Sequence, residues 1–450
     1  MALLVDQYEL TMLAAYHAEG HTDQAVFSLF VRRLPPERNF LLAAGLASVL
    51  SFLERLRFGS EALAYLQERP EFDEGFTDWL ARLRFTGDVW AVPEGTPVFA
   101  NEPILEIRAP LPEAQLVETF VMNQIHLQTV LASKAARVKL AAGDRAVVDF
   151  GIRRMHGIDA ALKSARAFHI AGVDATSNVL AGQVHGVPVT GTMAHSYIQS
   201  FDDELEAFRR FLTVYPDTVL LVDTYDTLEG VRKVVTLAEE LGDDFQVRGI
   251  RLDSGDLGEL ARGARSILDE AGLDGVEIFA SGGLDEWSIR ELVRSGAPID
   301  GFGVGTGMGV SSDAPSLDLA YKLTEYAGKG RLKLSSSKRI LPGRKQFFRL
   351  EVEGQAVRDV LTRHDEDVSG RPLLRKVMEG GRRTDDGRET LEDARQRAQE
   401  ELDRLPERVL ELEPAEPPFE VEVSQALEDY QARVIDDAVG PQGEAAAPGR

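Results

Sequence analysis

Cysteine is absent from all 450 residues of this sequence. That absence excludes a disulfide framework, a thiolate metal site and a cysteine nucleophile. Long apolar runs are missing as well, since none approaches the roughly 18 residues that a membrane-spanning helix needs. The first residues carry neither the basic segment nor the long apolar core of a signal peptide. We therefore expect a cytoplasmic protein that has no membrane partner.

Positive charge is also in short supply. Lys and Arg number 50 against 74 Asp and Glu, which gives a formal net charge of −24. Such a surface repels phosphate backbones, so we expect no nucleic-acid partner. A small anionic substrate would need positive charge concentrated at its site, from arginine, backbone N–H groups and helix N-termini.

The chain is long and apolar enough for two or three domains, with 44% hydrophobic residues. We expect an N-terminal α+β domain over residues 1–145. It contains an apolar periodicity from Leu46 that predicts a helix ending near Gly59, and a Pro- and Gly-rich β-structure over 88–103. A long helix should begin at Pro112 and break before Gly143.

Residues 146–345 are expected to form a phosphate-binding α/β barrel, because short apolar runs alternate with helical segments. The runs are Ala146–Phe150, Ala171–Ala175, Val187–Thr190, Thr218–Val222, Val247–Leu252, Val276–Ala280 and Ile299–Val304. Seven units favour a closed barrel over an open sheet, although a doubly wound fold also fits. Within and after this region we expect a basic loop or hairpin over Lys329–Arg349, a charged helix over 386–412 and a disordered tail over 440–450.

Functional residues of a parallel α/β barrel follow the carboxyl ends of its strands. The first run leads to Arg153 and Arg154, which suggest anion capture or, alternatively, a salt bridge between helices. The second run leads to Thr176-Ser177-Asn178, suited to polar recognition or to capping a helix. The third leads to His195, a candidate nucleophile or general acid–base that could instead be structural.

Carboxylates follow the next two runs. Asp223 could bind a ribose hydroxyl, orient His195 or hold Mg²⁺ through water. Arg251 and Asp253 stand two residues apart on an extended chain, so both point to one face. One cation and one carboxylate there could bind a phosphate and its hydroxylated sugar, or form a buried ion pair.

The last two runs end in glycine, at Ser281-Gly282-Gly283 and at Gly305-Thr306-Gly307. Glycines let backbone N–H groups approach a phosphate closely, and loops after the final two strands are the usual phosphate site of barrel enzymes. A dinucleotide-binding motif does not fit the second loop, because it comes late and begins no long βαβ unit. The pair therefore predicts a phosphorylated ligand.

Seven segments in order resemble the nicotinate phosphoribosyltransferases, from about residue 4 to residue 435. They are Asp6–Met12, Pro93–Thr96, Phe150–Arg154, Thr176–Gly182, Gly191–Ser196, Arg251–Asp256 and Ser281–Asp285. The resemblance implies an irregular (β/α) barrel with an additional α+β domain built from the N-terminal and C-terminal segments, residues 346–439 packing on the N-terminal domain. Val5 and Glu9 depart from the Thr and Gln that the family commonly shows.

The resemblance implies transfer of phosphoribosyl from phosphoribosyl pyrophosphate to nicotinate, yielding nicotinate mononucleotide for NAD salvage. It implies Mg²⁺ and ATP as co-substrate, with His195 as a phosphohistidine. Arg153 would pair with the nicotinate carboxylate, and Tyr8 would stack on the pyridine ring from the neighbouring subunit of a homodimer. The other expected binding or catalytic residues are Asn178, Asp223, Arg251, Asp253, Ser281, Gly282, Gly283, Gly305, Thr306 and Gly307.

Three rival interpretations remain open. A quinolinate-using transferase would need an extra basic cluster for a second carboxylate, and a nicotinamide-using one would need no carboxylate partner. A sugar-phosphate aldolase or isomerase working through a Schiff base would need a lysine at a strand end, and these runs show none. A phosphate-binding scaffold would not need His195, Asp223 and Asp253 to converge.

Overall fold

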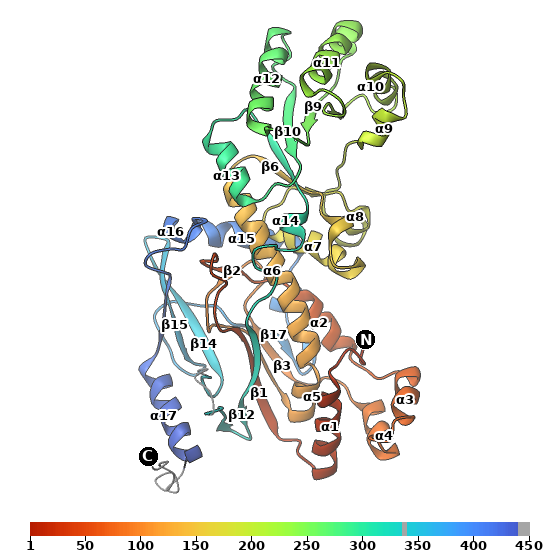
Figure 1. The fold of residues 1–450 in the computed structure, drawn as a ribbon. Helices are drawn as coiled ribbons and strands as arrows, with labels where there is room; N and C mark the ends of the chain where they lie inside the picture. The colour runs from red at the N-terminus through yellow and green to blue at the C-terminus, as the bar shows by residue number, and fades with distance from the viewer. Residues whose placement is uncertain (335–339, 440–450) are drawn as a thin grey trace, which may run out of the picture. The chain divides into compact units, whose positions relative to one another are not determined.

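A computed structural model describes residues 1–334 and 340–439. The chain divides into two compact units (Figure 1). Unit 1 consists of Met1–Val130 together with Ser316–Arg450, and unit 2 consists of Leu131–Pro315. The predicted tail 440–450 and part of the basic segment lie outside the described residues. No helix among the described residues has the length and apolarity to cross a membrane.

The main sheet of unit 1 is antiparallel, and its strands come from both terminal segments. In spatial order they are β13 (Lys329–Gly330), β12 (Leu319–Tyr326), β1 (Gln24–Val31), β5 (Pro103–Pro110), β3 (Asp88–Ala91), β17 (Arg375–Glu379) and β18 (Arg382–Arg383). Strand β1 pairs with β12 on one side and β5 on the other, and only its first residue is exposed. Its Val, Phe and Leu side chains suit a buried strand.

The rest of unit 1 consists of a second sheet, a short ribbon and helices. The second sheet has the order β16 (Arg371–Pro372), β14 (Lys345–Val352), β15 (Gln355–Arg363) and β19 (Glu420–Val423), and β2 (Leu41–Leu42) pairs with β4 (Pro97–Val98). The helices are α1 (Gln7–Glu19), α2 (Leu46–Arg55), α3 (Ser60–Gln67), α4 (Glu74–Arg82), α5 (Leu111–Leu116), α6 (Glu118–Ala142, which continues into unit 2), the short η3 (Asp386–Arg388), α15 (Leu391–Asp403), α16 (Glu407–Leu410) and α17 (Gln425–Val439).

The helix predicted from Leu46 is confirmed, and Val49, Leu50 and Leu53 are buried as its periodicity indicated. The charged helix predicted over 386–412 is wrong in extent. It begins only after Thr390, whose hydroxyl accepts from the backbone N–H of Asp393 in a capping box. It ends before Pro406, which cannot continue a helix, and a separate turn of helix follows.

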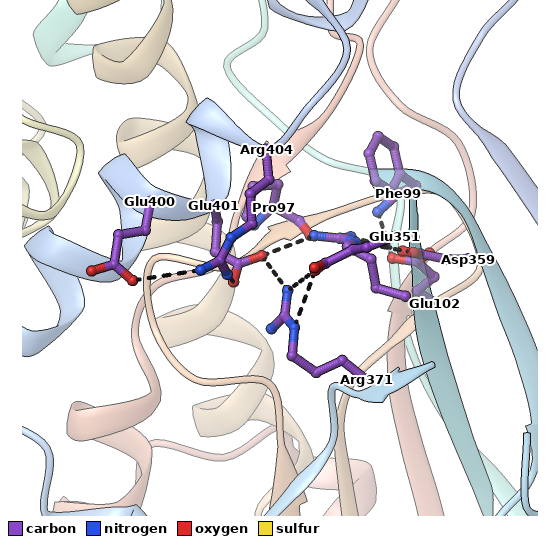
Figure 2. Close-up of polar contacts among 10 residues, drawn as sticks. Pro97, Phe99, Glu102, Glu351, Asp359, Arg371, Glu400, Glu401 and Arg404 are labelled. Carbon is purple, nitrogen blue, oxygen red and sulfur yellow. Dashed lines mark hydrogen bonds and ion pairs between the residues drawn. The ribbon is translucent and has the colours of Figure 1, made fainter. Parts of the chain in front are cut away.

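A buried ion-pair network joins the second sheet of unit 1 to α15 (Figure 2). Arg349 on β14 donates through Nε and Nη2 to the two carboxylate oxygens of Asp359, at 3.0 and 2.7 Å. Its Nη1 lies 3.3 Å from Oε2 of Glu401. Burial, and then the adjacent Asp359 carboxylate, raise the pKa of Glu102 well above its ordinary value. The neutral form of the Glu102 carboxyl is thus favoured over its ionised form beside this ion pair.

Unit 2 contains one parallel sheet, which confirms the predicted α/β class. Its order is β7 (Ala175–Thr176), β6 (Ala146–Asp149), β11 (Gly301–Val304), β10 (Glu277–Ser281), β9 (Gly249–Leu252) and β8 (Val219–Leu221). The helices are η1 (Ile152–Arg154), α7 (Ile158–Ile170), α8 (Val179–His185), α9 (His195–Gln199), α10 (Glu204–Leu212), α11 (Thr227–Leu241), η2 (Gly242–Asp244), α12 (Leu257–Glu270), α13 (Glu286–Arg294) and α14 (Thr306–Gly309).

This sheet is a curled half-barrel, so the predicted closed barrel is corrected for the described residues. The last strand, β11, pairs with the first, β6, which is the cyclic order of a barrel and not of a doubly wound sheet. The gap lies between β7 and β8. There the run Val187–Thr190 contributes only a single bridge, between Thr176 and Val189. The chain then forms α9 and α10 where a closing strand would be needed.

Candidate active site

The carboxyl ends of the six parallel strands of unit 2 lie at one edge of the sheet, and the predicted site residues of that unit follow them. The turn after β6 carries Arg153, β9 leads into Asp253, and β10 ends at Ser281. Tyr8 differs, because it lies on α1 in unit 1, with 47% of its surface exposed. Every predicted site residue except Tyr8 therefore belongs to unit 2.

Hydrogen bonds link the ends of β8, β9 and β10. The backbone N–H of Asp253 donates to Oδ2 of Asp223 at 3.1 Å, and the Ser254 hydroxyl donates to the same oxygen at 2.7 Å. On the other side, the Ser281 hydroxyl donates to Oδ1 of Asp253. Oδ1 of Asp223 is buried and has no hydrogen-bond partner among the described residues. A buried carboxylate oxygen without a donor is unusual in a folded protein.

His195 begins α9 and contacts two of these strand ends. Its Nδ1 lies 3.1 Å from the Thr224 hydroxyl, and its Nε2 lies 3.8 Å from Oδ2 of Asp253. The side chain is 39% exposed, so the imidazole is held in place without being sealed from solvent. Thr224 has no role among the sequence-based predictions, although it directly follows Asp223. A hydroxyl next to a predicted carboxylate was the only available signal.

Arg251 fastens the loop before α9 to the sheet. Its Nη2 donates to the carbonyl oxygen of Met193 at 2.9 Å, and its Nη1 lies 3.7 Å from Oδ1 of Asp253. The guanidinium carbon lies 5.8 Å from the centre of the Phe150 ring, within cation–π range. Burial lowers the pKa of Arg251, and the like charge of Arg153 adds to that effect. The buried Nε of Arg251 has no partner among the described residues. A buried ion pair with Asp253, the alternative to a ligand-binding role, therefore leaves this donor unused.

Asn178 is occupied within the fold. Its Oδ1 accepts from the backbone N–H of Ala181 at 3.2 Å and caps α8, while its Nδ2 donates to the carbonyl of Ala161 at 3.0 Å. Only 3% of its surface is exposed. The capping alternative therefore describes its contacts here, and a part in substrate binding stays a prediction.

Asp149 organises two further strand ends, and the sequence analysis gave it no role. It is fully buried at the end of β6 and accepts from the backbone N–H of Gly151 at 2.8 Å and from the Thr176 hydroxyl at 2.7 Å. Burial raises the pKa of its carboxyl, which those two hydrogen bonds oppose. The signal was its place, because it is the charged residue that closes an apolar run just before Arg153.

The first glycine loop has a backbone that requires glycine, and the second is closely packed. Gly282 has φ +97°, and a Cβ there would lie 1.9 Å from the carbonyl oxygen of Asp253. Gly283 has φ +70°, a left-handed conformation that other residues rarely adopt. In the second loop, the Thr306 hydroxyl accepts from Nη1 of Arg154 at 3.1 Å. A Cβ on Gly307 would lie 3.3 Å from the carbonyl oxygen of Leu284, so the two loops are in contact.

These features define the class of the protein as an α/β enzyme acting on a phosphorylated sugar. Adjacent glycine loops suit a phosphate, and carboxylates beside them suit sugar hydroxyls or a metal-bound leaving group. Arginines after β6 and on β9 supply the local positive charge that the acidic chain otherwise lacks.

Comparison with known proteins makes the assignment specific. Three family models match: the nicotinate phosphoribosyltransferase (NAPRTase) N-terminal domain over residues 3–126, the nicotinate phosphoribosyltransferase (NAPRTase) family over 145–336, and the nicotinate phosphoribosyltransferase C-terminal domain over 367–431. Together they cover most of the chain. It belongs to the nicotinate phosphoribosyltransferase family, as the resemblance in its motifs indicated.

Relatives span nearly the whole chain. Nicotinate phosphoribosyltransferase pncB2 of Mycobacterium tuberculosis is 54% identical over 433 residues, covering 96% of this chain and 94% of its own. The Bacillus subtilis enzyme is 42% identical over 385 residues, covering 83% and 79%. The crystal structure of human nicotinic acid phosphoribosyltransferase aligns with a TM-score of 0.85 at 28% identity, covering 96% of this chain and all of that one.

Proposed function

We propose that this enzyme transfers the 5-phosphoribosyl group of phosphoribosyl pyrophosphate to nicotinate, giving nicotinate mononucleotide and pyrophosphate for NAD salvage. The observation that carries the proposal is the contact between the two glycine loops beside linked Asp223 and Asp253 on one sheet edge. A phosphate on the loops places the attached ribose within reach of the carboxylates. The named relatives support the choice of nicotinate as acceptor.

The roles we assign follow the geometry. Backbone N–H groups of Gly282, Gly283, Gly305, Thr306 and Gly307 bind the 5′-phosphate, since glycines leave the backbone open to its close approach. Asp223, Asp253 and Arg251 hold the ribose and pyrophosphate, with Ser281 fixing the Asp253 carboxylate through its hydroxyl.

Arg153 is the partner we assign to the nicotinate carboxylate, because a guanidinium matches a carboxylate with two donors. Tyr8 would stack on the pyridine ring from the partner of a homodimer, unit 1 serving as the additional α+β domain. Burial, and then the nearby Glu118 carboxylate, raise the pKa of Tyr8, so its phenol stays neutral against an aromatic ring. Asn178 would act beside them chiefly by holding the start of α8.

The reaction needs little proton chemistry from the protein. The pyridine nitrogen of nicotinate donates its lone pair to C1 of the ribose as the C1–O bond to pyrophosphate breaks. The bonding electrons leave with pyrophosphate, and the sugar passes through an oxocarbenium-like state. Rate enhancement therefore comes from positioning and from stabilising charge, which the strand-end residues supply.

Magnesium fits this site as an ion bound together with substrate. No group of three or more His, Cys, Asp or Glu among residues 1–334 and 340–439 would hold a metal by itself. Mg²⁺ commonly uses one or two carboxylates and takes its other ligands from substrate phosphates and water. Asp223, with its unpartnered Oδ1, and Asp253 are the residues that would hold it. Bound there, Mg²⁺ would supply positive charge to neutralise the pyrophosphate leaving group.

His195 is the residue we propose as the phosphoryl acceptor from ATP. With Nδ1–H donating to Thr224, the Nε2 lone pair can attack the γ-phosphorus of ATP, and ADP leaves. Water later attacks the phosphoimidazole and releases inorganic phosphate. The phosphorylated side chain would add negative charge beside Asp253 during the cycle.

A pyrophosphate-release assay with nicotinate and phosphoribosyl pyrophosphate, with and without ATP, tests this proposal. We expect turnover with nicotinate far above that with nicotinamide, and equal turnover of both would reject the assigned acceptor. Incubation with γ-labelled ATP should give an acid-labile phosphate that is absent from His195→Ala. Wild-type protein without that label would reject the phosphohistidine and leave phosphoribosyl transfer standing.

A further inference from the structure

One lysine lies buried behind both glycine loops. Lys134 sits on the part of α6 that belongs to unit 2, and its side chain is 2% exposed. Its ammonium lies 2.5 Å from Oε2 of Glu286 and 2.6 Å from Oδ1 of Asp313. Glu286 is fully buried, and its other oxygen accepts from Nε of Arg137 at 3.0 Å. A single cation is therefore shared by two carboxylates from different parts of the chain.

The two carboxylates stand directly behind the two phosphate-binding loops. Glu286 is the first residue of α13, three residues after Gly283. Asp313 follows α14, the helix that carries Gly307. Lys134 consequently connects the segment behind the first loop to the segment behind the second.

The loops also touch in front of this connection. A Cβ on Gly307 would lie 3.3 Å from the carbonyl oxygen of Leu284 and 3.6 Å from Cβ of Asp285. The backbone N–H of Ser312 donates to the carbonyl of Gly307 at 3.2 Å. Glu286 directly follows Asp285, and Asp313 directly follows Ser312. A displacement of either carboxylate therefore also displaces the glycine loops.

We propose that Lys134 is a positioning residue for the reaction, holding both loops in register so that their N–H groups converge on one 5′-phosphate. This inference rests on the proposed function of the loops. Buried ion pairs add little net stability compared with apolar side chains of similar volume, since desolvation offsets their attraction. Strands β10 and β11, which lead into the two loops, pair with each other as far as Ser281 and Gly303. What the shared ammonium adds is a fixed geometry for the segments that follow the loops, beyond the reach of that pairing.

The test compares Lys134→Met with Asp313→Asn, which removes the tie to the second loop alone. Phosphate positioning tolerates little error, since a displacement of about 1 Å can cost about a hundredfold in rate. We expect Lys134→Met to raise KM for phosphoribosyl pyrophosphate about ten- to hundredfold, with KM for nicotinate within about twofold. Asp313→Asn should fall between wild type and Lys134→Met.

Lys139→Met is the matched control. Lys139 lies on the same helix and pairs with Asp174 at 3.2 Å, away from both loops. It should leave the ratio of the two KM values unchanged even if it lowers the melting temperature. Calorimetric titration with ribose 5-phosphate gives a second reading of loop geometry that needs no turnover.

The outcomes separate the inference from the function on which it rests. Wild-type protein that fails to bind ribose 5-phosphate or to release pyrophosphate would reject the proposed function itself. Normal binding by wild type, together with unchanged KM for phosphoribosyl pyrophosphate in both variants, would overturn the role of Lys134. Equal rises in both KM values would also overturn it, because they indicate a general loss of structure. If Lys134→Met does not fold, Asp313→Asn decides alone.

Discussion

Gly282 offers the sharpest test of how the first loop is built, through the substitution Gly282→Ala. The residue has φ +97°, and a Cβ would lie 1.9 Å from the carbonyl oxygen of Asp253. An ordinary contact to carbon begins at about 3.4 Å, so that carbonyl or the loop must move by about 1.5 Å. The moving groups are Asp253 and the N–H donors that we assign to the 5′-phosphate.

Two costs add in this variant. The left-handed backbone strains alanine by about 1–2 kcal/mol, which lowers stability. The displacement of about 1.5 Å reaches the reacting groups and should lower kcat/KM by at least about a hundredfold, equivalent to roughly 3 kcal/mol of transition-state stabilisation. The loss should appear mainly in KM for phosphoribosyl pyrophosphate.

Gly296→Ala is the control, because Gly296 has φ +66° and no atom within 4 Å of the position of its Cβ. It carries the same kind of backbone strain without the collision. Steady-state kinetics in both substrates, with melting curves for both variants, separate strain from displacement. Activity of Gly282→Ala within about threefold of the Gly296→Ala value would refute the reasoning.

Three further predictions test other parts of the structure. Arg153→Ala should raise KM for nicotinate about ten- to hundredfold, with little change in KM for phosphoribosyl pyrophosphate. Arg154→Ala loses a contact to the second glycine loop, so it should raise KM for phosphoribosyl pyrophosphate and leave KM for nicotinate nearly unchanged. The same pattern of KM changes in both variants would contradict the assignment. Burial raises the pKa of Glu9 to about 7, so its contribution to stability is complete below about pH 4.5 and is lost as pH rises through about 7. Urea unfolding at pH 5 and pH 8 measures the difference in unfolding free energy between Glu9→Gln and wild type. From pH 5 to pH 8 this difference should change by up to roughly 3 kcal/mol in favour of Glu9→Gln. A difference that is the same at both pH values would rule this out. Arg349→Met should cost about 3–5 kcal/mol in unfolding free energy because it leaves buried carboxylates unpaired, against at most about 1 kcal/mol for Arg358→Met, whose ion pair with Glu422 is exposed; similar losses would contradict the buried network.

Local pattern predicted the elements that carry the site. The runs Thr218–Val222 and Val276–Ala280 correspond to β8 and β10 within a residue or two, because short runs of mostly apolar residues suit the strands of a parallel sheet. The run Val187–Thr190 contains Pro188, which has no backbone N–H for a sheet ladder, and it makes one bridge. Whether a run finds a partner depends also on the path of the chain after it, which the run itself does not encode.

The site divides in the same way. Residues directly after a strand, such as Asp253 and Gly282, could be predicted because the chemistry and the place coincide in sequence. Lys134 could not, since its partner Glu286 is 152 residues away and a lysine in a helix usually faces solvent. Asn178 shows a third case, in which one pattern fits both a ligand and a helix cap, and only coordinates show which contacts it makes.

The pairing of β1 with β12 has a consequence for synthesis. Residues Gln24–Val31 leave the ribosome almost 300 residues before Leu319–Tyr326, an interval of tens of seconds at roughly 5–20 residues per second. During that time β1 can pair with β5, while its other edge offers free N–H and C=O groups on a hydrophobic strand, which is a template for aggregation. Unit 2, whose residues are contiguous, can meanwhile complete its own sheet. The yield of folded enzyme should therefore depend on chaperones that shield the N-terminal segment. It should also depend on slow growth of the producing cells at low temperature.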